Sequence, residues 1–322
     1  MQIQRDNQGT FFELAVAQRG ASNQVLETIA QEVDFSGAEQ QVAATYSTGG
    51  RPGHRVAVLL RVMILQHLYG LSDPQAEAQV KDRLSFQKFV QLAPDEAVPD
   101  ETALCRFRQR LIQCGLHEAL LGLLNRQLET KGYLVQRTTM VDATIIESSR
   151  KRPTPEVAAS GQAPDAQASY TFVRGRSFYG YKAHISSDAG HQLIRSAIIS
   201  SANACEGHYL TRLTPADTQA VYADKAYDTK ANRLWLKTRG MADGILKKSA
   251  LHIKLTAEDL AQNQQKGLVR RNIERVFAHL KQWQNYRRAR YLGLAKNQLE
   301  LTLKVVAYNL KRLAKLRAWQ TA

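Results

Sequence analysis

Three carboxylates occupy positions where an acidic side chain is well placed for chemistry. Asp142 lies within Arg137–Glu147, a run rich in Thr, Val and Ile that predicts a buried strand. A charge inside such a strand is costly unless it is paired or binds a metal ion. Asp224 directly follows a second strand-like run, Ala220–Ala223, and strand ends of mixed sheets favour functional residues. Glu274 lies in a helical pattern further along the chain.

The helical pattern around Glu274 places cations beside this acid. At about 100° per residue, Arg270 and Lys281 lie within about 40° of Glu274, so the three residues form one narrow stripe. The neighbouring face is apolar and is expected to pack against the sheet. It comprises Ile273, Phe277 and Leu280. This layout predicts that Glu274 faces the strand carboxylates.

Carboxylates contributed by separate elements suit divalent metal chemistry. Oxygen ligands favour Mg²⁺ or Mn²⁺, which keep water or substrate phosphate in their coordination shell. Two such ions about 3.5–4 Å apart can activate a water or a 3′-hydroxyl at a phosphodiester. The alternative is structural: Asp142 and Asp224 cap turns, and Glu274 pairs with Arg270. This structural alternative accounts for each acid taken alone, but it explains less well why all three acids occupy such positions together.

The blocks around the three acids resemble the DDE transposases of bacterial insertion sequences, specifically the large group that contains the IS-four and IS-five families. Val141–Thr144 matches the V-D-A-T block of the first Asp, and Asp224–Asp228 matches the D-K-x-Y-D-like block of the second. The spacing of Arg270, Glu274 and Lys281 matches the signature Y-x2-R-x3-E-x6-K.

The Tyr of that signature is absent, because Gly267 stands in its place. This departure affects any phosphate contact by the Tyr but leaves the three acids intact. Further blocks match in order over nearly the whole chain. They are G-R-P (50–52), L-Y-G-L-S-D (68–73), L-S-F-Q-K-F (84–89), P-D-E-T (99–102), R-F-R (106–108), G-Y-K-x-H (180–184) and the R-Y-x-G-L-x-K-N stretch within 288–297.

The resemblance implies an α/β protein with an RNase H-like mixed-sheet catalytic core and an N-terminal all-helical domain. Residues 1–134 would recognise terminal inverted repeats, and residues 135–322 would form the catalytic domain. The implied activity is metal-dependent cleavage at transposon ends and strand transfer into target DNA, by a homodimer using Mg²⁺ or Mn²⁺, two ions in all. Catalytic and metal-binding roles would fall to Asp142, Asp224 and Glu274.

Two other functions stay open at this point. One is an RNase H-like nuclease that cuts DNA without joining it. The other is a catalytically silent DNA-binding repressor derived from a transposase. The matched positions of Asp142, Asp224 and Glu274, with Arg270 and Lys281, argue against a loss of catalysis.

Further candidates for DNA contact flank the acids. Lys182 and His184 alternate within a strand and share one side, which the resemblance places near the site. Lys225 and Tyr227 could hold phosphate or stack on a base. Structural alternatives are a polar strand face for the first pair and simple packing for Tyr227. A basic stretch with interleaved tyrosines is also typical of DNA binding. Its candidates are Arg287, Arg288, Arg290, Tyr291 and Lys296.

The first 134 residues are predicted to be helical. Val56–Tyr69 is a mostly apolar run that Gly70 would end. Ser72 and Gln75 have the spacing of a capping box, and the helix that they open is expected to run to about Leu84. Another helix is expected after Pro99-Asp100.

Strands and two closing helical patterns are predicted for the remainder. The strands expected after Arg137–Glu147 are 180–186, 192–200, 220–223 and 244–246. The turn at 188–190 favours a hairpin. Residues 150 to about 177 lack apolar periodicity and predict a loop. Asp165 and Asp188 are interpreted as turn residues.

The charge balance favours a polyanionic partner. The 322 residues include 44 Lys and Arg against 29 Asp and Glu, a net charge of +15. From Arg270 onward there are thirteen basic residues and two acids. No apolar run approaches the roughly 20 residues of a membrane span, and Met1–Phe12 lacks a signal-peptide layout. Three cysteines without a C-x-x-C pair predict a reducing cytoplasmic compartment. The resemblance implies that this is the bacterial cytoplasm, in association with the nucleoid.

Overall fold

The computed structural model describes residues 23–46, 53–93, 95–134, 137–151, 153–154, 157, 160, 163–173, 175–249 and 254–320. The G-R-P block at 50–52 lies outside the described residues. The chain divides into two compact units, one of Met1–Gln127 with Val306–Ala322 and the other of Leu128–Val305.

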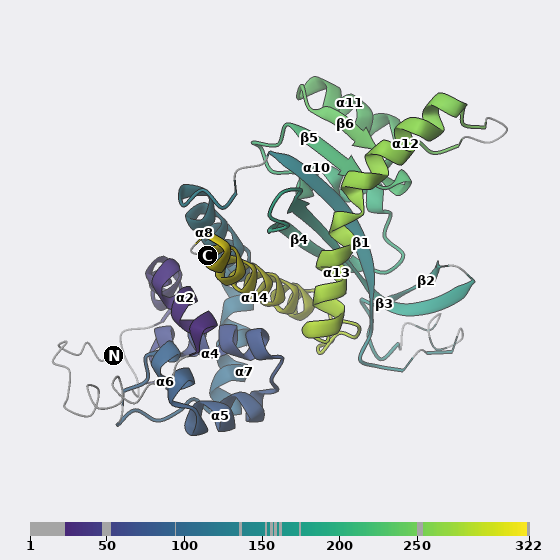
Figure 1. Cartoon of the computed structure of the whole chain (residues 1–322). Coiled ribbons are helices and arrows are strands. Elements are labelled where there is room, and N and C mark those ends of the chain that lie inside the picture. Colours follow the sequence, from purple (N-terminus) through teal and green to yellow (C-terminus); the bar gives the residue numbers. More distant parts are fainter. Residues whose placement is uncertain are drawn as a thin grey trace. The chain divides into compact units, whose positions relative to one another are not determined.

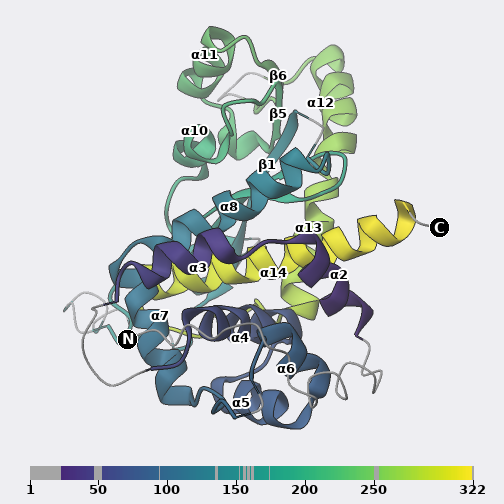
Figure 2. The ribbon, with the colours of Figure 1, turned by 90° about the vertical axis from the view of Figure 1, so that its left-hand side faces the viewer.

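The first unit is all-helical (Figures 1 and 2). α4 is its central helix, and nearly every side chain along it is buried because the run is apolar on all faces. Among the described residues no single helix is long and apolar enough to cross a membrane. One pair of helices, α4 and α5, is together long and apolar enough by length and composition, but the two are bent by 103°. The helices are α2 (Gln24–Glu32), α3 (Ser36–Ala43), α4 (Val56–Tyr69), α5 (Asp73–Asp82), α6 (Leu84–Val90), α7 (Glu101–Gln113) and α8 (Leu116–Thr130).

Local sequence signals define the ends of these helices. Gly70 ends α4 with a left-handed backbone, φ 67°. Ser72 and Gln75 form the predicted capping box of α5. That helix ends at Asp82, however, and α6 begins at Leu84, so the prediction of one helix to about Leu84 was wrong at its end. Asp100 caps α7 by accepting a hydrogen bond from the amide of Ala103, at 2.6 Å.

The end of the last helix, α14 (Leu294–Gln320), belongs to the helical unit from Val306 onward. There Asn309 contacts Asn125, Lys311 lies over the ring of Tyr69, and Arg317 pairs with Glu32 at 3.2 Å. The compact units therefore differ from the predicted division into 1–134 and 135–322, because the end of α14 packs with the helical unit. The functional division itself stays a prediction.

The second unit contains a six-stranded mixed sheet. β1 is central: it pairs antiparallel with β3 on one edge and parallel with β5 on the other. β3 also pairs antiparallel with β2 and β4, and β5 pairs parallel with β6. This is the predicted α/β architecture with an RNase H-like core. The strands are β1 (Thr138–Glu147), β2 (Ser169–Val173), β3 (Arg176–Asp188), β4 (Ile194–Ser201), β5 (Ala220–Ala223) and β6 (Ala242–Ile245).

Helices cover this sheet (Figure 1). A buried apolar cluster joins Val141, Val221 and Ile245 of the strands to the η1 (Glu206–Tyr209), α10 (Leu210–Leu213) and α11 (Lys230–Thr238) region. α12 (Ala257–Arg270) and α13 (Asn272–Trp283) also contact β1. The predicted apolar face of α13 is buried as expected. It comprises Ile273, Phe277 and Leu280.

The hairpin of β3 and β4 confirms the prediction for the 188–190 turn. The carboxylate of Asp188 accepts hydrogen bonds from the amides of Gly190, His191 and Leu193, at 2.7–2.9 Å. The prediction of a loop through 177 was wrong, because β2 and the first residues of β3 lie within it. The alternation in Ser169–Val173 is short and follows a long polar run, which concealed it.

Gly180 is required where β3 passes the end of β1. A Cβ atom there would lie 2.3 Å from the carbonyl oxygen of Ile146 and 2.6 Å from the amide of Ser148. Gly267 is the opposite case, since nothing lies within 4 Å of a Cβ added to it.

We predict that Gly180→Ala lowers the free energy of unfolding by about 1–3 kcal/mol, because backbone atoms cannot retreat from the added methyl group. Gly267→Ala is the matched control and should raise it by up to about 1 kcal/mol, since alanine favours a helix interior. Chemical denaturation of both variants measures this. Equal stability of Gly180→Ala and the wild type would contradict the close approach.

Candidate active site

The first two acids lie side by side where β5 ends. The parallel pairing of β1 with β5 stops at Val141 and Ala223. Asp142 and Asp224 are therefore the next residues along these two neighbouring segments. Adjacent strands are about 4.8 Å apart. Beyond this point the same edge of β1 is unpaired, within the described residues, until Glu147 bridges to Arg288. We call this edge, residues 142–147, the notch.

Asp142 is a largely buried carboxylate whose side chain is 14% exposed. Its oxygens accept hydrogen bonds from Nη1 of Arg270 at 2.7 Å and from the amide of Ala143 at 2.8 Å. Burial raises the pKa of Asp142 to about 6, although Arg270 opposes this shift; the charges of Asp224 and Glu206 raise the pKa further. Asp142 is thus a buried carboxylate whose cost of burial outweighs the stabilisation by Arg270.

Arg270 connects the first acid to the third. Its Nη2 lies 3.1 Å from Oε1 of Glu274, whose side chain is 63% exposed. The predicted continuous helix is wrong here, because α12 ends at Arg270 and α13 begins at Asn272. The stripe survives the break, since the contact from Arg270 to Glu274 is kept. A single guanidinium therefore stands between two of the predicted catalytic acids.

Asp224 begins the turn that follows β5. Its carboxylate accepts a hydrogen bond from the amide of Lys225 at 2.7 Å and caps η2 (Lys225–Tyr227). Lys225 is exposed, whereas Tyr227 is completely buried. Burial raises the pKa of Tyr227 well above its ordinary value, and the charges of Glu206, Asp142 and Asp224 add to the shift. In this position Tyr227 cannot stack on a DNA base.

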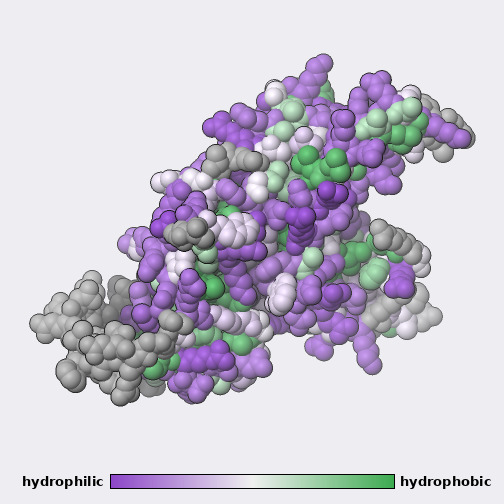
Figure 3. Space-filling view, viewed as in Figure 1, coloured by the Kyte–Doolittle hydropathy of each residue, from purple (hydrophilic) through white to green (hydrophobic). Residues whose placement is uncertain are grey.

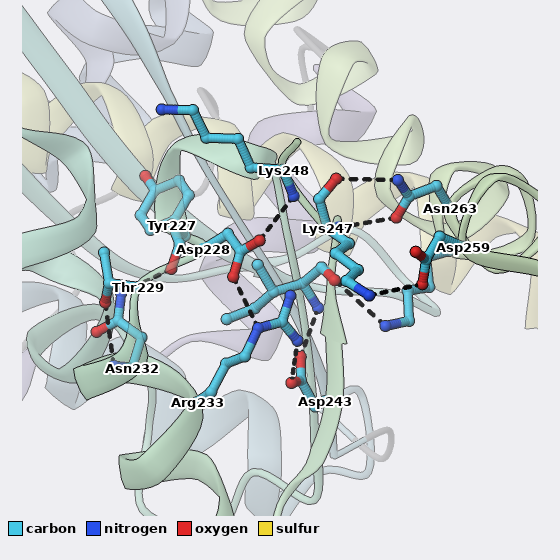
Figure 4. Close-up of polar contacts among 12 residues, drawn as sticks. Tyr227, Asp228, Thr229, Asn232, Arg233, Asp243, Lys247, Lys248, Asp259 and Asn263 are labelled. Atoms are coloured by element: carbon cyan, nitrogen blue, oxygen red, sulfur yellow. Dashed lines mark hydrogen bonds and ion pairs between the residues drawn. The ribbon is translucent and has the colours of Figure 1, made fainter. Parts of the chain in front are cut away.

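Asp228, the last residue of the D-K-A-Y-D block, anchors the turn (Figure 4). Its carboxylate accepts hydrogen bonds from Nε of Arg233 at 2.7 Å and from the amide of Lys248 at 2.6 Å. Arg233 also pairs with Asp243 of β6. The second acidic position of the block is therefore structural, and it fixes the chain around Asp224.

A second set of contacts in Figure 4 fixes the start of α12. Lys247 pairs with Asp259 at 2.8 Å, and its backbone exchanges two hydrogen bonds with the side chain of Asn263. The segment after β6 is thereby attached to the helix that ends at Arg270. Sequence analysis did not find these residues, because polar side chains of this kind carry no recognisable spacing.

Lys182 and His184 do not share the face of Asp142. In the antiparallel register Asp142 pairs with Ile185, whereas Lys182 and His184 pair with the alternate residues of β1. His184 is completely buried, stacks on Tyr209 at 4.0 Å, and lies 2.8 Å from the hydroxyl of Ser200. Burial lowers the pKa of His184 to about 3, with contributions from Lys182 and Arg212. His184 is therefore a neutral core residue that DNA cannot reach here.

Lys182 makes local contacts instead. Its Nζ pairs with Glu206 at 3.1 Å and donates to the carbonyl oxygen of Ala204 at 3.0 Å. Both contacts lie on the η1 side of the sheet. Glu206, the partner of Lys182, is close enough to Asp142 to raise its pKa, so a role for Lys182 near the acids stays a prediction.

The basic stretch after α13 closes the far end of the notch. The amide of Glu147 donates to the carbonyl oxygen of Arg287 at 3.0 Å, and the amide of Ala289 donates to that of Glu147 at 2.7 Å. The side chains of Arg287, Arg288, Arg290 and Lys296 are exposed, and Tyr291 is half-buried.

Lys281 lies toward the same end of the notch. Burial lowers its pKa, Arg287 adds to this effect and Glu147 opposes it. The stripe predicted on α13 thus runs from Glu274, near Asp142, toward the exposed basic residues. Cationic side chains therefore lie at both ends of the unpaired edge of β1, Arg270 beside Asp142 and Arg288 beside Glu147.

Asp165 holds the basic stretch against the sheet. It is buried and accepts hydrogen bonds from the hydroxyls of Ser148 at 2.7 Å and Tyr181 at 2.6 Å. The amide of Gly293 donates to the hydroxyl of Tyr181 at 2.8 Å, and the amide of Leu294 donates to Gln167 at 2.6 Å. The interpretation of Asp165 as a turn residue was therefore incomplete.

The donor set fits a divalent cation, although its side chains are not gathered as a finished metal site. Within the described part of the chain, no three His, Cys, Asp or Glu side chains lie together closely enough to hold an ion. Asp142 and Glu274 instead share the Arg270 guanidinium. A cation is therefore already bound between two hard oxygen donors, which are the ligands that Mg²⁺ and Mn²⁺ prefer.

Comparison with protein families identifies the class. The model of the family described as "Transposase DDE domain" matches residues 134–310, and that described as "Transposase domain (DUF772)" matches residues 15–110. Since the first match covers more than half of the chain, the protein belongs to the DDE transposase family, as the resemblance predicted. It is a DNA transposase of the kind typical of bacterial insertion sequences, an enzyme class that cleaves and joins DNA with divalent metal ions.

A solved structure with a similar arrangement is described as "Cryo-EM structure of piggyBac transposase synaptic complex with hairpin DNA (SNHP)". The sequences are 6% identical, the TM-score is 0.41, and the match covers 94% of this chain and 78% of that chain. A TM-score this low gives no information about the site.

We predict that Asp142→Asn stabilises the metal-free protein at pH 7.5 by about 1–3 kcal/mol. Folding raises the pKa of Asp142 to about 6, so the folded state disfavours its charge at neutral pH. The difference should vanish as the pH falls below about 4, where the carboxyl is protonated in both states.

Glu274→Gln is the matched control, and its exposed side chain should give no comparable gain. Urea denaturation across this pH range, with a chelator present, measures both variants. A lower free energy of unfolding for Asp142→Asn than for the wild type at pH 7.5 would contradict the assigned cost of burying the charge of Asp142.

Proposed function

We propose that Asp142, Asp224 and Glu274 are the catalytic and metal-binding residues of this transposase, with two Mg²⁺ or Mn²⁺ ions. The observation that carries the proposal is the shared guanidinium: Arg270 bridges Asp142 and Glu274, while Asp224 directly follows the neighbouring strand β5. The proposal brings together acids from a central strand, a strand end and a helix.

When bound, the ions would activate a water or a 3′-hydroxyl and stabilise the leaving oxygen of a phosphodiester. The chain's own residues prepare for this. The carboxylates of Asp142 and Asp224 accept hydrogen bonds from the amides of Ala143 and Lys225, so one oxygen of each acid is oriented by the residue that follows it. The Glu274 side chain is 63% exposed, and among the described residues its ion-pair partner is Arg270, which leaves it able to move.

Arg270 would change partners when metal ions replace it between the acids. A guanidinium offers several donors in a planar fork that suits phosphate oxygens. Released from Asp142, it lies beside the site where a scissile phosphate would bind. We therefore assign Arg270 two roles, balancing charge without metal and holding phosphate with it.

We propose that the bound DNA runs along the notch from Asp142 toward Glu147. Glu147 lies five positions beyond Asp142, which corresponds to about 17 Å along a strand or about five base pairs of duplex. Arg287 and Arg288 stand at that end with exposed side chains. We propose that they hold the backbone of the bound DNA, together with Lys281 and the other exposed basic residues. These are Lys225, Arg290 and Lys296.

The remaining assignments follow from the class. We propose that residues 1–134 recognise terminal inverted repeats, that a homodimer joins two ends, and that the protein works on nucleoid DNA in the bacterial cytoplasm. Target DNA would bind at the site formed by the same three acids during strand transfer. His184 and Tyr227 have no place in this scheme, because both are buried.

We predict that Glu274→Gln abolishes cleavage of a duplex carrying the element's ends, lowering the rate by at least about a hundredfold, while DNA affinity changes little. The variant keeps the shape of Glu274 but loses a negative ligand. Denaturing gels with Mg²⁺ or Mn²⁺ should show 3′-hydroxyl ends for the wild type only.

Glu258→Gln, an exposed acid on α12, is the matched control and should cleave normally. Cleavage by Glu274→Gln at the wild-type rate would refute the triad. Cleaved ends without joined products would favour a nuclease, and tight binding without cleavage by any variant would favour a repressor.

We predict further that DNA binding weakens steeply with salt and that Arg288→Ala reduces the slope of log affinity against log salt by about 0.9, the value for one phosphate contact. Lys237→Ala, an exposed cation of α11, should leave the slope unchanged. Fluorescence anisotropy at several salt concentrations measures both. An unchanged slope for Arg288→Ala would remove this residue from the DNA path.

A further inference from the structure

The hairpin formed by β2 and the start of β3 exposes apolar side chains that contribute little to the fold. Phe172 is 74% exposed and Val173 is 42% exposed. Burying a phenylalanine is among the larger single contributions to stability, and this one is left in solvent. We call Phe172, Val173 and Arg176 the hairpin tip.

Strand register places Phe172 on the catalytic face of the sheet. Directly paired residues point to the same side. Asp142 shares its side with Ile185 of β3, and alternation along β3 carries that side to Ser177, which pairs with Phe172. The aromatic side chain and the first catalytic acid therefore face the same way.

The hairpin continues the sheet beyond the end of β1, on the β3 side. Gly180 of β3 pairs with Glu147 at the end of β1 and with Ser169 of β2. Arg176 lies four residues beyond Gly180, about 13 Å further along the strand. Added to the length of the notch, this places the tip at most about 30 Å from Asp142, or about nine base pairs of duplex.

The charge around the tip suits a polyanion. Arg176 is exposed, and the nearby segment that follows β1 carries exposed Arg150 and Lys151. Tyr170 of β2 donates a hydrogen bond to the carbonyl oxygen of Pro153, which keeps that segment beside the hairpin. No residue from 169 to 180 is acidic. Figure 3 shows hydrophobic atoms beside hydrophilic ones in the region of β2 and β3.

We propose that the hairpin tip binds the minor groove of the duplex held in the notch. This inference rests on the proposed DNA path. Phe172 would pack against sugars and base edges as an apolar wedge, as such side chains do in minor-groove recognition. Arg176 would contact a flanking phosphate.

A second copy of the chain is a weaker candidate for this surface. A stable protein interface buries about 800 Å² on each partner, and the tip offers two apolar side chains among cations. Two such tips would also repel each other, since each carries only positive charge. Duplex DNA satisfies both the charge and the narrow apolar contact.

The test compares Phe172→Ala with Phe172→Trp and with Leu234→Ala, a control residue on α11 that is 62% exposed. DNA affinity is measured by anisotropy on two duplexes, one reaching about five base pairs from the cleavage site and one reaching about fifteen. Hydroxyl-radical footprinting on the longer duplex gives a second readout. Phe172 is largely in solvent, so neither substitution threatens folding.

We expect Phe172→Ala to weaken binding to the longer duplex about tenfold and to leave the shorter duplex unaffected. Protection about seven to ten base pairs from the cleavage site should be lost, Phe172→Trp should restore it, and Leu234→Ala should match the wild type. Equal affinity and footprint for Phe172→Ala and the wild type would overturn the proposal. So would a loss of self-association, seen by sedimentation, with DNA binding intact.

Failure of the hairpin contact is separable from failure of the catalytic site. Normal cleavage by Glu274→Gln would refute the triad whatever the hairpin variants do. Loss of cleavage by Glu274→Gln, combined with a normal footprint for Phe172→Ala, would keep the triad and reject the hairpin contact.

Discussion

The buried charge of Asp142 requires a cation beside it, and this requirement connects the sheet to the helix that carries the third acid. Arg270 meets it at 2.7 Å and reaches Glu274 with its other nitrogen. Without that guanidinium, α13 would still pack through its apolar face, but no ion pair would link Glu274 to Asp142 of β1. The same pair of contacts lets the proposed metal site stay folded without metal ions, because a protein cation balances its charge.

The catalytic edge arises from unequal strand lengths. β1 continues for several residues after β5 ends, so its edge is free between Asp142 and the bridge from Glu147 to Arg288. Asp228 and Asp165 fix the two ends, the first through Arg233 and the second through hydroxyls and the amide of Gly293. Neither acid touches the proposed reaction. Both determine where the residues that do so are placed.

Sequence patterns predicted the elements and the three acids because each depends on local features: a β-rich run, a strand end, a helical stripe. The sequence could not show which side of β3 carries Lys182 and His184 relative to Asp142, since that depends on register with β1. It also missed the break at Arg271 and the buried role of Asp165, and it left Tyr227 open between DNA contact and packing, because a turn-forming or aromatic residue looks the same whether it is exposed or enclosed.

The most direct test of the shared cation site is a crystal of the protein soaked in Mn²⁺, with an anomalous difference map. We expect a peak within about 2.5 Å of carboxylate oxygens of Asp142 and Asp224, with Glu274 turned toward it and Arg270 displaced from Asp142. A map with no peak at these acids at saturating Mn²⁺, and with Arg270 still bridging Asp142 and Glu274, would contradict the assignment of the metal site.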